Sequence, residues 1–288
     1  MQNNKFIISF SEKKDFEEIV YKLNKYFQQP QGFFQNYVPV LYKPGKNTHD
    51  NHIIVKCNDE IVGIIAVKKK NIHINNEVFS FVLLGSLAVD FDYRNQGIMG
   101  LLFDYILNKY SDEVDFFGLS GSFDRYKRFG FYPSEKMYSY KYELKELGFN
   151  PYSFEVVNKD TVSFCEELYL KQSYKVEREN MIDNLYMWEY KPYLIRKDGK
   201  NLGYLIYNPK FNLIEEVILL DNNELNDVIY SFVLFINMNT NLKICINNNY
   251  LKEFINKDIQ FEEYFERTLY KIQNPKLKGI YIPRSDLI

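Results

Sequence analysis

The chain has 288 residues, a length that suggests about two domains at roughly 150 residues each. Its 36 Lys and Arg residues nearly balance 38 Asp and Glu residues, which gives a net charge of −2 and an isoelectric point near 6.0. This balance lacks the basicity of a non-specific nucleic-acid binder, so we expect no nucleic-acid partner. Hydrophobic residues at 46% and charged residues at 26% exclude a collagen-like or generally disordered chain.

The cysteines, the histidines and the lack of targeting signals further restrict the class of protein. The three cysteines are scattered and form no CxxC pair, which is typical of reduced thiols in an intracellular compartment. The first residues lack the basic and apolar segments of a signal peptide, and the most apolar stretch, residues 79–89, is about half the length of a membrane-spanning helix. The three histidines show no metal-ligand spacing. We therefore expect a cytoplasmic protein without a metal site or a membrane partner.

The spacing of apolar residues predicts strands and helices through the first half of the chain. Up to residue 89 we expect a strand, a helix, a loop with a short helix, a hairpin and a long strand: Phe6–Phe10, Phe16–Phe27, Pro30–Gly45, His52–Lys56 with Glu60–Lys68, and Val78–Val89. A polar turn then leads into a helix, a strand, a short helical stretch and an outer strand: Phe91–Gly97, Ile98–Ile106, Val114–Ser120, a stretch ending at Gly130, and Phe131–Leu144. The best domain boundary lies within Glu146–Pro151.

The segment Arg94–Gly100 (RNQGIMG) stands where the long strand passes through a turn into a helix. The first N–H groups of a helix have no internal partner and bind phosphate well. Gly97 lets the backbone approach an anion closely, and Arg94 adds a fixed positive charge. A solvated Arg in an ordinary polar turn is the alternative interpretation, and this segment alone does not exclude it.

Two motifs in the expected order favour the phosphate site. The stretch Leu84–Leu102 (LGSLAVDFDYRNQGIMGLL) resembles motif A of the GCN5-related N-acetyltransferases, the GNAT family, and Tyr126–Pro133 (YKRFGFYP) resembles its motif B. The resemblance covers roughly Phe6–Leu144 and implies an α+β fold, a mixed, mostly antiparallel sheet flanked by helices. One departure is Met99, which replaces the usual small residue two positions after Gly97.

The resemblance implies acetyl-CoA as cosubstrate and names its contacts. Acetyl-CoA would lie between the strand ending at Val89 and the strand Val114–Ser120. Backbone groups of one short segment would pair with the pantetheine arm and polarise the thioester: Leu87, Ala88 and Val89. Arg94 and the amides of the following loop would hold the pyrophosphate: Asn95, Gln96, Gly97, Ile98, Met99 and Gly100.

Acetyl transfer also requires groups that move protons. Tyr126 stands where the family places a general-acid tyrosine, although with 25 Tyr in the chain a packing role is the alternative. The general base stays open: Ser86, Asp90 and His52 are candidates, and a water chain would leave no side-chain signature. The aromatic segment Phe33–Tyr42 is a candidate wall of the substrate pocket or part of the core.

The second half repeats the order of elements without the phosphate-binding turn. Its predicted elements are a helix, a hairpin, a strand, a helix and a strand: Thr161–Lys175, Tyr193–Arg196 with Leu202–Tyr207, Leu213–Leu220, Leu225–Asn237, and Leu242–Ile246. The turn Asp221–Glu224 has neither Arg nor Gly, and its two acids would repel a pyrophosphate. We therefore expect an acetyl-CoA-binding GNAT domain over residues 1–147 and a degenerate GNAT-like domain over residues 148–288, with an unrelated α+β domain as the alternative.

Such a tandem resembles the enhanced-intracellular-survival type of acetyltransferase. Those proteins usually carry a third, sterol-carrier-like domain and use their terminal carboxylate in the active site; from the end of this sequence at Ile288 we expect no full third domain. The leading interpretation is an N-acetyltransferase that moves an acetyl group to a small-molecule or peptide amine. A Fem-like tRNA-dependent aminoacyltransferase, disfavoured by the isoelectric point, and a non-catalytic CoA sensor are the alternatives. The many aromatic residues are compatible with a homo-oligomer, although no coiled-coil heptad supports one.

Overall fold

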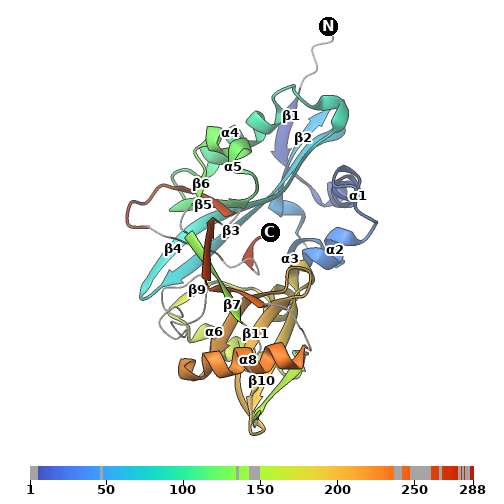
Figure 1. Ribbon diagram of the computed structural model, residues 1–288. Coiled ribbons are helices and arrows are strands. Elements are labelled where there is room, and N and C mark those ends of the chain that lie inside the picture. The colour runs from blue at the N-terminus through green and yellow to red at the C-terminus, as the bar shows by residue number, and fades with distance from the viewer. Residues whose placement is uncertain are drawn as a thin grey trace. The chain divides into compact units, whose positions relative to one another are not determined.

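The computed structural model describes residues 6–45, 48–133, 136–142, 150–236, 242–246, 261–265, 268–277, 280, 282 and 286–288 (Figure 1). The chain divides into two units. The first contains Met1–Ser134, Arg267–Ile282 and Asp286–Ile288, and the second contains Glu135–Glu266 and Pro283–Ser285. The boundary that we expected between residues 147 and 148 falls in residues 143–149, outside the described part of the chain.

The first unit is built on a mixed, mostly antiparallel sheet flanked by helices, which confirms the expected fold. The strand order is β1-β2-β3-β4-β5-β15-β6. These strands are β1 (Ile7–Phe10), β2 (His52–Cys57), β3 (Glu60–Ile74), β4 (Glu77–Val89), β5 (Phe116–Ser120), β6 (Tyr132–Pro133) and β15 (Thr268–Ile272). Neighbouring strands run antiparallel except β4 and β5, which are parallel.

The β2–β3 hairpin illustrates how local sequence sets this sheet. Its two-residue turn, Asn58-Asp59, has φ values of 51° and 65°. Positive φ at both central positions is the type I′ geometry that matches the twist of an antiparallel pair, and Asn and Asp tolerate it better than most residues. The hydrophobic runs on either side therefore pair antiparallel, with one shift of register between Val55 and Lys56, and almost every residue of β2 is buried.

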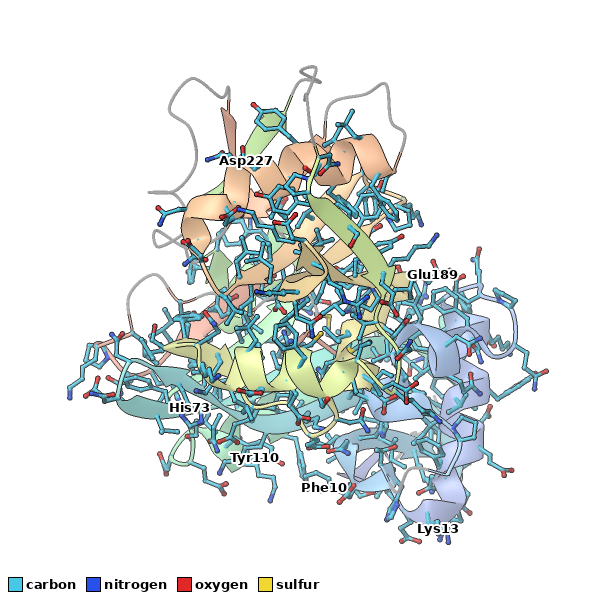
Figure 2. The ribbon with its side chains drawn as sticks, turned by 90° about the horizontal axis from the view of Figure 1, so that it is seen from below. Phe10, Lys13, His73, Tyr110, Glu189 and Asp227 are labelled. Carbon is cyan, nitrogen blue, oxygen red and sulfur yellow. The ribbon has the colours of Figure 1, made fainter. Side chains whose placement is uncertain are left out.

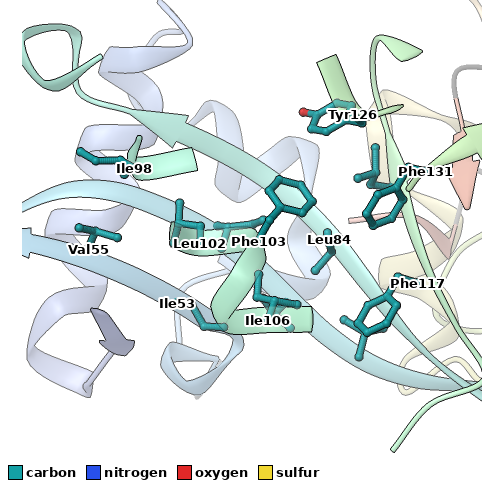
Figure 3. Packing of buried hydrophobic residues seen from close by; sticks show 14 of the residues in the cluster. Ile53, Val55, Leu84, Ile98, Leu102, Phe103, Ile106, Phe117, Tyr126 and Phe131 are labelled. Atoms are coloured by element: carbon teal, nitrogen blue, oxygen red, sulfur yellow. The ribbon is translucent and has the colours of Figure 1, made fainter. Parts of the chain in front are cut away.

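Helices cover both faces of the sheet in the first unit, α1 (Phe16–Tyr26) on one side and α4 (Ile98–Tyr110) on the other (Figure 1). Shorter helices α2 (Phe33–Tyr37), α3 (Pro39–Tyr42) and α5 (Phe123–Tyr126) complete the unit. Apolar residues of α4 recur at helical spacing and pack on β2 to β5: Ile98, Leu102, Phe103 and Ile106 (Figure 3). At the far end of α4, Lys109 lies between the rings of Phe10 and Tyr110, both labelled in Figure 2.

The second unit has its own sheet, in the order β14-β7-β13-β12-β11-β10-β8. The strands are β7 (Lys136–Tyr142), β8 (Tyr152–Val156), β10 (Lys191–Lys197), β11 (Lys200–Asn208), β12 (Leu213–Leu219), β13 (Leu242–Ile246) and β14 (Phe261–Phe265). The unit also contains α6 (Val162–Leu170), α7 (Met181–Leu185), α8 (Leu225–Phe235) and the short strand β9 (Tyr174–Val176). The helix predicted over Thr161–Lys175 thus ends earlier than expected. Phe232 of α8 is fully buried against Phe154 and Tyr193.

Two strands exchange places between the sheets, and this corrects one expectation. We expected Phe131–Leu144 to be a single outer strand of the first domain. Instead, β6 ends at Pro133, and β7 pairs with β13 and β14 in the second unit's sheet. The vacated edge beside β5 is filled by β15, which comes from late in the chain and pairs antiparallel over Phe116–Ser120. Strand pairing with so distant a segment leaves no local signal in the sequence.

Candidate active site

The site begins where two parallel strands separate. β4 and β5 pair from Phe81 opposite Phe116 to Leu84 opposite Leu119. Beyond that point, residues 85–89 of β4 remain paired with β3 only. No described strand pairs with the β5 side of this segment, so an extended ligand can add to this edge as another strand does.

A bulge in β4 marks the start of this unpaired edge. Ala66 of β3 lies opposite Gly85, whereas Ile64 lies opposite Ala88, so β4 has one extra residue there. Ser86, within the bulge, has a φ of 46°. A non-glycine residue with positive φ costs about 1 kcal/mol or more, and such strain often accompanies a functional site. The bulge redirects the backbone where the free edge begins.

The turn after β4 is built to present helix amides. Asp90 begins it, with Oδ1 accepting a hydrogen bond from the Asp92 amide at 3.1 Å. Gly97 stands at the N-cap of α4 with a φ of 81°, which glycine adopts without strain, and no side chain caps the helix. The first amides of any helix have no intrahelical acceptor, and those of α4 have no side-chain cap either.

Arg94 lies beside this helix start in a defined orientation. Its guanidinium stacks on the Phe91 ring, 4.0 Å from the centroid, and its Nε lies 3.4 Å from the Val89 carbonyl oxygen. These contacts hold a positive charge between the end of β4 and the amides of α4. Such a combination binds phosphate by charge and by hydrogen bonds together.

A cavity of about 760 Å³ connects these features. The sequence-predicted cofactor residues that line it are Leu87, Ala88, Val89, Arg94, Asn95, Gly97, Ile98, Met99 and Gly100. Gln96, also predicted, does not line the cavity, because its side-chain amide turns back to donate to the Asp92 carbonyl oxygen at 3.2 Å. Five further residues complete the lining, and sequence reasoning missed them: Tyr26, Phe27, Tyr93, Arg125 and Arg128. They come from the end of α1 and the residue after it, from the turn, and from α5 and the 3-10 turn Lys127–Phe129 that follows it, and only the fold determines how these segments approach β4.

Tyr126, the predicted acid, lies on α5 and is not itself among the residues that line the cavity, although Arg125 and Arg128 are. Its side chain is buried, packs beside Phe103 and directs its hydroxyl away from Phe131 (Figure 3). Gly121 makes room for it, because a Cβ at position 121 would lie 2.4 Å from the Tyr126 ring. Burial raises the pKa of Tyr126, while the charge and hydrogen bond of Arg125 oppose this shift. The hydroxyl therefore keeps its proton at neutral pH and can donate it.

The candidate bases occupy very different environments. Asp90 accepts a 2.5 Å hydrogen bond from the hydroxyl of Tyr26, so its second oxygen is also engaged. Burial by itself raises the pKa of Asp90, but the hydrogen bonds from Tyr26 and Asp92 hold it below its ordinary value. His52 is fully buried, and burial lowers its pKa to about 4. Ser86 lies half-buried at the bulge.

The segment Asp286–Ile288 lies against a face of β4 at Gly85. All three residues are buried, and a Cβ at position 85 would lie 2.0 Å from the backbone oxygen of Ile288. Lys70 of β3 donates to the backbone oxygen of Asp286 at 3.3 Å. Gly85 therefore allows Ile288 to approach the sheet at the residue before Ser86.

Residues 8–134 match the family model of the acetyltransferase (GNAT) domain. This stretch contains β4, the turn, α4 and α5, and thus every residue that lines the cavity. Residues 8–134 are a GNAT acetyltransferase domain. No protein of curated function matches the chain by sequence.

Solved structures share the fold of the GNAT domain and of the second unit together. A GCN5-related N-acetyltransferase from Kribbella flavida aligns with a TM-score of 0.70 at 13% identity over 94% of this chain and 72% of its own. Eis1 from Mycobacterium abscessus aligns with a TM-score of 0.61 at 11% identity over 94% and 74%. An N-myristoyltransferase from Saccharomyces cerevisiae, solved with bound myristoyl-CoA, aligns with a TM-score of 0.53 at 13% identity over 93% and 80%. At these identities the likeness concerns the fold.

In the second unit, the turn Asp221–Glu224 has the same place in the order of elements as the phosphate-binding turn of the GNAT domain. Its acidic side chains make hydrogen bonds and an ion pair with nearby protein groups. Asp221 accepts a hydrogen bond from the Asn223 amide at 3.0 Å. Glu224 pairs with Lys197 at 2.6 Å and accepts a hydrogen bond from Tyr152. Both acids thus stabilise the turn itself.

The described residues contain neither a metal-ligand cluster nor a membrane-spanning helix. There, no group of three or more His, Cys, Asp or Glu side chains is arranged to hold a metal ion. Likewise, none of the helices in the described part of the chain combines the length and apolarity needed to cross a membrane.

Proposed function

We propose that this protein is an acetyl-CoA-dependent N-acetyltransferase that moves the acetyl group to a primary amine of a small molecule or peptide. The observation that carries the proposal is the cavity of the GNAT domain. It joins the uncapped start of α4 and three arginines, Arg94, Arg125 and Arg128, to the unpaired edge of β4. A ligand with phosphates at one end and an extended amide-containing arm at the other matches this order, and acetyl-CoA is such a ligand.

Each part of acetyl-CoA has matching groups in the cavity. The pyrophosphate would accept hydrogen bonds from the first amides of α4, with Arg94 supplying charge. The pantetheine arm carries two amides and would pair with the free edge at Leu87 to Val89. The thioester would then reach the bulge at Ser86, because the arm runs away from the phosphates along β4.

The chemistry requires a neutral amine and a protonated leaving group. The amine nitrogen attacks the thioester carbon, and the carbonyl electrons move to its oxygen. A backbone N–H of the β4 edge would stabilise that oxyanion. When the C–S bond breaks, the Tyr126 hydroxyl would donate its proton to the sulfur, and CoA would leave as the thiol. The proton lost by the amine nitrogen would pass to solvent, and solvent would return a proton to the Tyr126 oxygen.

Thiol release tests the proposal directly. Purified protein is incubated with acetyl-CoA and a panel of amines, including polyamines, aminoglycosides and lysine peptides. Amine-dependent thiol release with formation of the acetylated amine is the expected result. Binding of CoA by calorimetry without thiol release from any amine would refute catalysis and indicate a sensor. Myristoyl-CoA in a parallel series tests acyl-chain preference.

The substitution Tyr126→Phe isolates the acid. It removes one hydroxyl from a buried ring, and we expect kcat to fall by about 100-fold or more while acetyl-CoA binding survives. Tyr105→Phe is a matched control, since Tyr105 lies on α4 with its ring against Phe10. Equal turnover in Tyr126→Phe and the parent protein would remove Tyr126 from the mechanism.

A further inference from the structure

Tyr26 joins the end of α1 to the turn that follows β4. Its hydroxyl donates to Asp90 Oδ2 at 2.5 Å, and the two residues are only 7% and 9% exposed. The other oxygen of this carboxylate, Oδ1, accepts a hydrogen bond from the Asp92 amide at 3.1 Å. Hydrogen bonds to a carboxylate are stronger than those between neutral groups. Both oxygens of Asp90 therefore hold the turn, one from within it and one from α1.

The end of α1 is itself fixed on the sheet. Lys22, one helical turn before Tyr26, donates to the Ile61 carbonyl oxygen at 2.7 Å, at the start of β3. The Asp90 amide donates to the Val62 carbonyl oxygen at 2.9 Å, so the turn adjoins the same part of β3. Residues four apart lie on one face of a helix. Lys22 thus fixes the place from which Tyr26 meets Asp90.

The ring of Tyr26 makes a second contact with the turn. It meets the Phe91 ring edge to face, with a centroid distance of 6.1 Å and an interplanar angle of 82°. The Arg94 guanidinium stacks on the same Phe91 ring, 4.0 Å from its centroid. Because Phe91 is 45% exposed, surrounding core does not hold its ring on every side. Tyr26 therefore supports Arg94 through Phe91 as well as through Asp90.

These contacts lie beside the phosphate-binding end of the cavity. Tyr26 lines the cavity together with Arg94 and the start of α4, and the proposed acetyl transfer gives it no role. We propose that Tyr26 is a positioning residue for the phosphates of acetyl-CoA, and that it holds the turn so that Arg94 stays beside the first amides of α4. The identity of the ligand rests on the proposed function. The thioester would lie further along β4, so loss of the Tyr26 hydroxyl should weaken phosphate binding and spare the chemical step.

Two acyl donors separate this role from general damage to the site. S-acetylpantetheine has the arm and the thioester of acetyl-CoA but lacks the phosphates. In Tyr26→Phe we expect KM for acetyl-CoA and Kd for CoA to rise about tenfold, the lower end of the range for a hydrogen bond to a charged group. We expect kcat with acetyl-CoA, and kcat/KM with S-acetylpantetheine, to stay within about twofold of the parent protein. Tyr21→Phe is the matched control, because Tyr21 lies on the same helix and is 64% exposed.

Two further variants test the route to Arg94. Phe91→Leu removes the ring that joins Tyr26 to Arg94, so it should also raise KM for acetyl-CoA and leave S-acetylpantetheine unaffected. When Tyr26→Phe is combined with Arg94→Gln, we expect no further rise in KM beyond that of Arg94→Gln alone, because residues that act as a unit give non-additive effects. Thermal denaturation confirms that each variant is folded at the assay temperature.

Three results would overturn the inference: an unchanged Kd for CoA in Tyr26→Phe, equal losses with both acyl donors, or additive losses in the double variant. A different result would refute the proposed function. If the parent protein binds CoA but transfers acetyl from neither donor to any amine, catalysis is absent. Calorimetry with CoA would still test the role of Tyr26 in that case, so the two failures are distinguishable.

Discussion

Gly85 and Ile288 touch through their backbones: a Cβ on residue 85 would lie 2.0 Å from the backbone oxygen of Ile288. Real Cβ atoms do not approach an oxygen so closely, so the position requires glycine. Ile288 is only 5% exposed, and Lys70 holds the neighbouring Asp286 through its backbone oxygen. The segment 286–288 is thus part of the core at the start of the unpaired β4 edge.

Gly85→Ala should therefore displace Ile288 or strain β4. We expect a loss of about 1–3 kcal/mol in the free energy of unfolding, together with a large loss of amine acetylation, because Ser86 follows directly. Urea denaturation measures the first effect and thiol release the second. Gly100→Ala is the stability control, since a Cβ there meets no atom within 4 Å. In a chain lacking Ile288 the effect of Gly85→Ala should largely vanish, and a persistent effect would contradict the clash.

The arginines of the cavity should determine affinity for acetyl-CoA. Arg94→Gln and Arg128→Gln each remove a positive charge from the lining, and we expect KM for acetyl-CoA to rise by roughly tenfold with kcat little changed. The rise of KM with salt should be less steep in both variants, because fewer charges attract the phosphates. Lys127→Gln is the matched control, since Lys127 pairs with Asp124 and does not line the cavity. An unchanged KM in both arginine variants would place the phosphates elsewhere.

Local signals predicted most of the GNAT domain. The β-branched runs around Asn58-Asp59 predicted the hairpin, and the change of period after Val89 predicted the turn and α4. The cavity lining on β4 and α4 was predicted for a related reason. Those residues are contiguous in the chain, and the resemblance to a phosphate-binding motif covers them as one stretch.

Contributions from distant segments could not be predicted in the same way. Tyr26 and Phe27 reach the cavity from the end of α1, and nothing in an amphipathic helix says which residue its last turn presents to a ligand. The exchange of β7 for β15 depends on pairing with residues far along the chain. The contact of His52 with the Tyr42 hydroxyl was not predicted either, because Tyr42 is one aromatic among many in its segment.

The hydrogen bond from Tyr26 to Asp90 should make stability depend on pH. Since the pKa of Asp90 lies below its ordinary value near 3.8, its contribution is present above that value and is lost as pH falls through the lower folded value. Tyr26→Phe removes the bond and should raise the pKa of Asp90. We expect a lower melting temperature at pH 7 and a deficit that shrinks below about pH 3.8.

Tyr21→Phe provides the comparison for this prediction, because Tyr21 lies on the same helix and is 64% exposed. Its melting temperature should follow that of the parent protein at every pH. Thermal scans from pH 7 to pH 3 measure all three proteins. If the melting temperature of Tyr26→Phe stays below that of the parent protein by the same amount over this range, the lost stability does not depend on the charge of Asp90.

The second unit contains a buried ion pair whose removal should be costly. Arg178 and Glu216, with side chains 2% and 9% exposed, are joined by contacts of 2.6 and 3.1 Å. Tyr204 donates to Glu216 at 2.6 Å, and the Arg178 guanidinium lies 3.8 Å from the centroid of the Tyr169 ring. Glu216→Gln removes the carboxylate charge that holds the buried guanidinium through these two contacts, so we expect a loss of about 3–5 kcal/mol in the free energy of unfolding.

Replacing both partners should cost less than replacing one. In Arg178→Met combined with Glu216→Leu both charges of the pair are removed, and apolar side chains of similar length fill the space. We therefore expect urea midpoints in the order parent protein, double variant, Glu216→Gln, with the last lowest. The exposed pair of Glu167 on α6 and Lys171 just after it supplies the control. Glu167→Gln should lower the free energy of unfolding by less than about 1 kcal/mol. A double variant less stable than Glu216→Gln would mean that the ion pair itself, rather than the avoidance of a lone charge, stabilises the second unit.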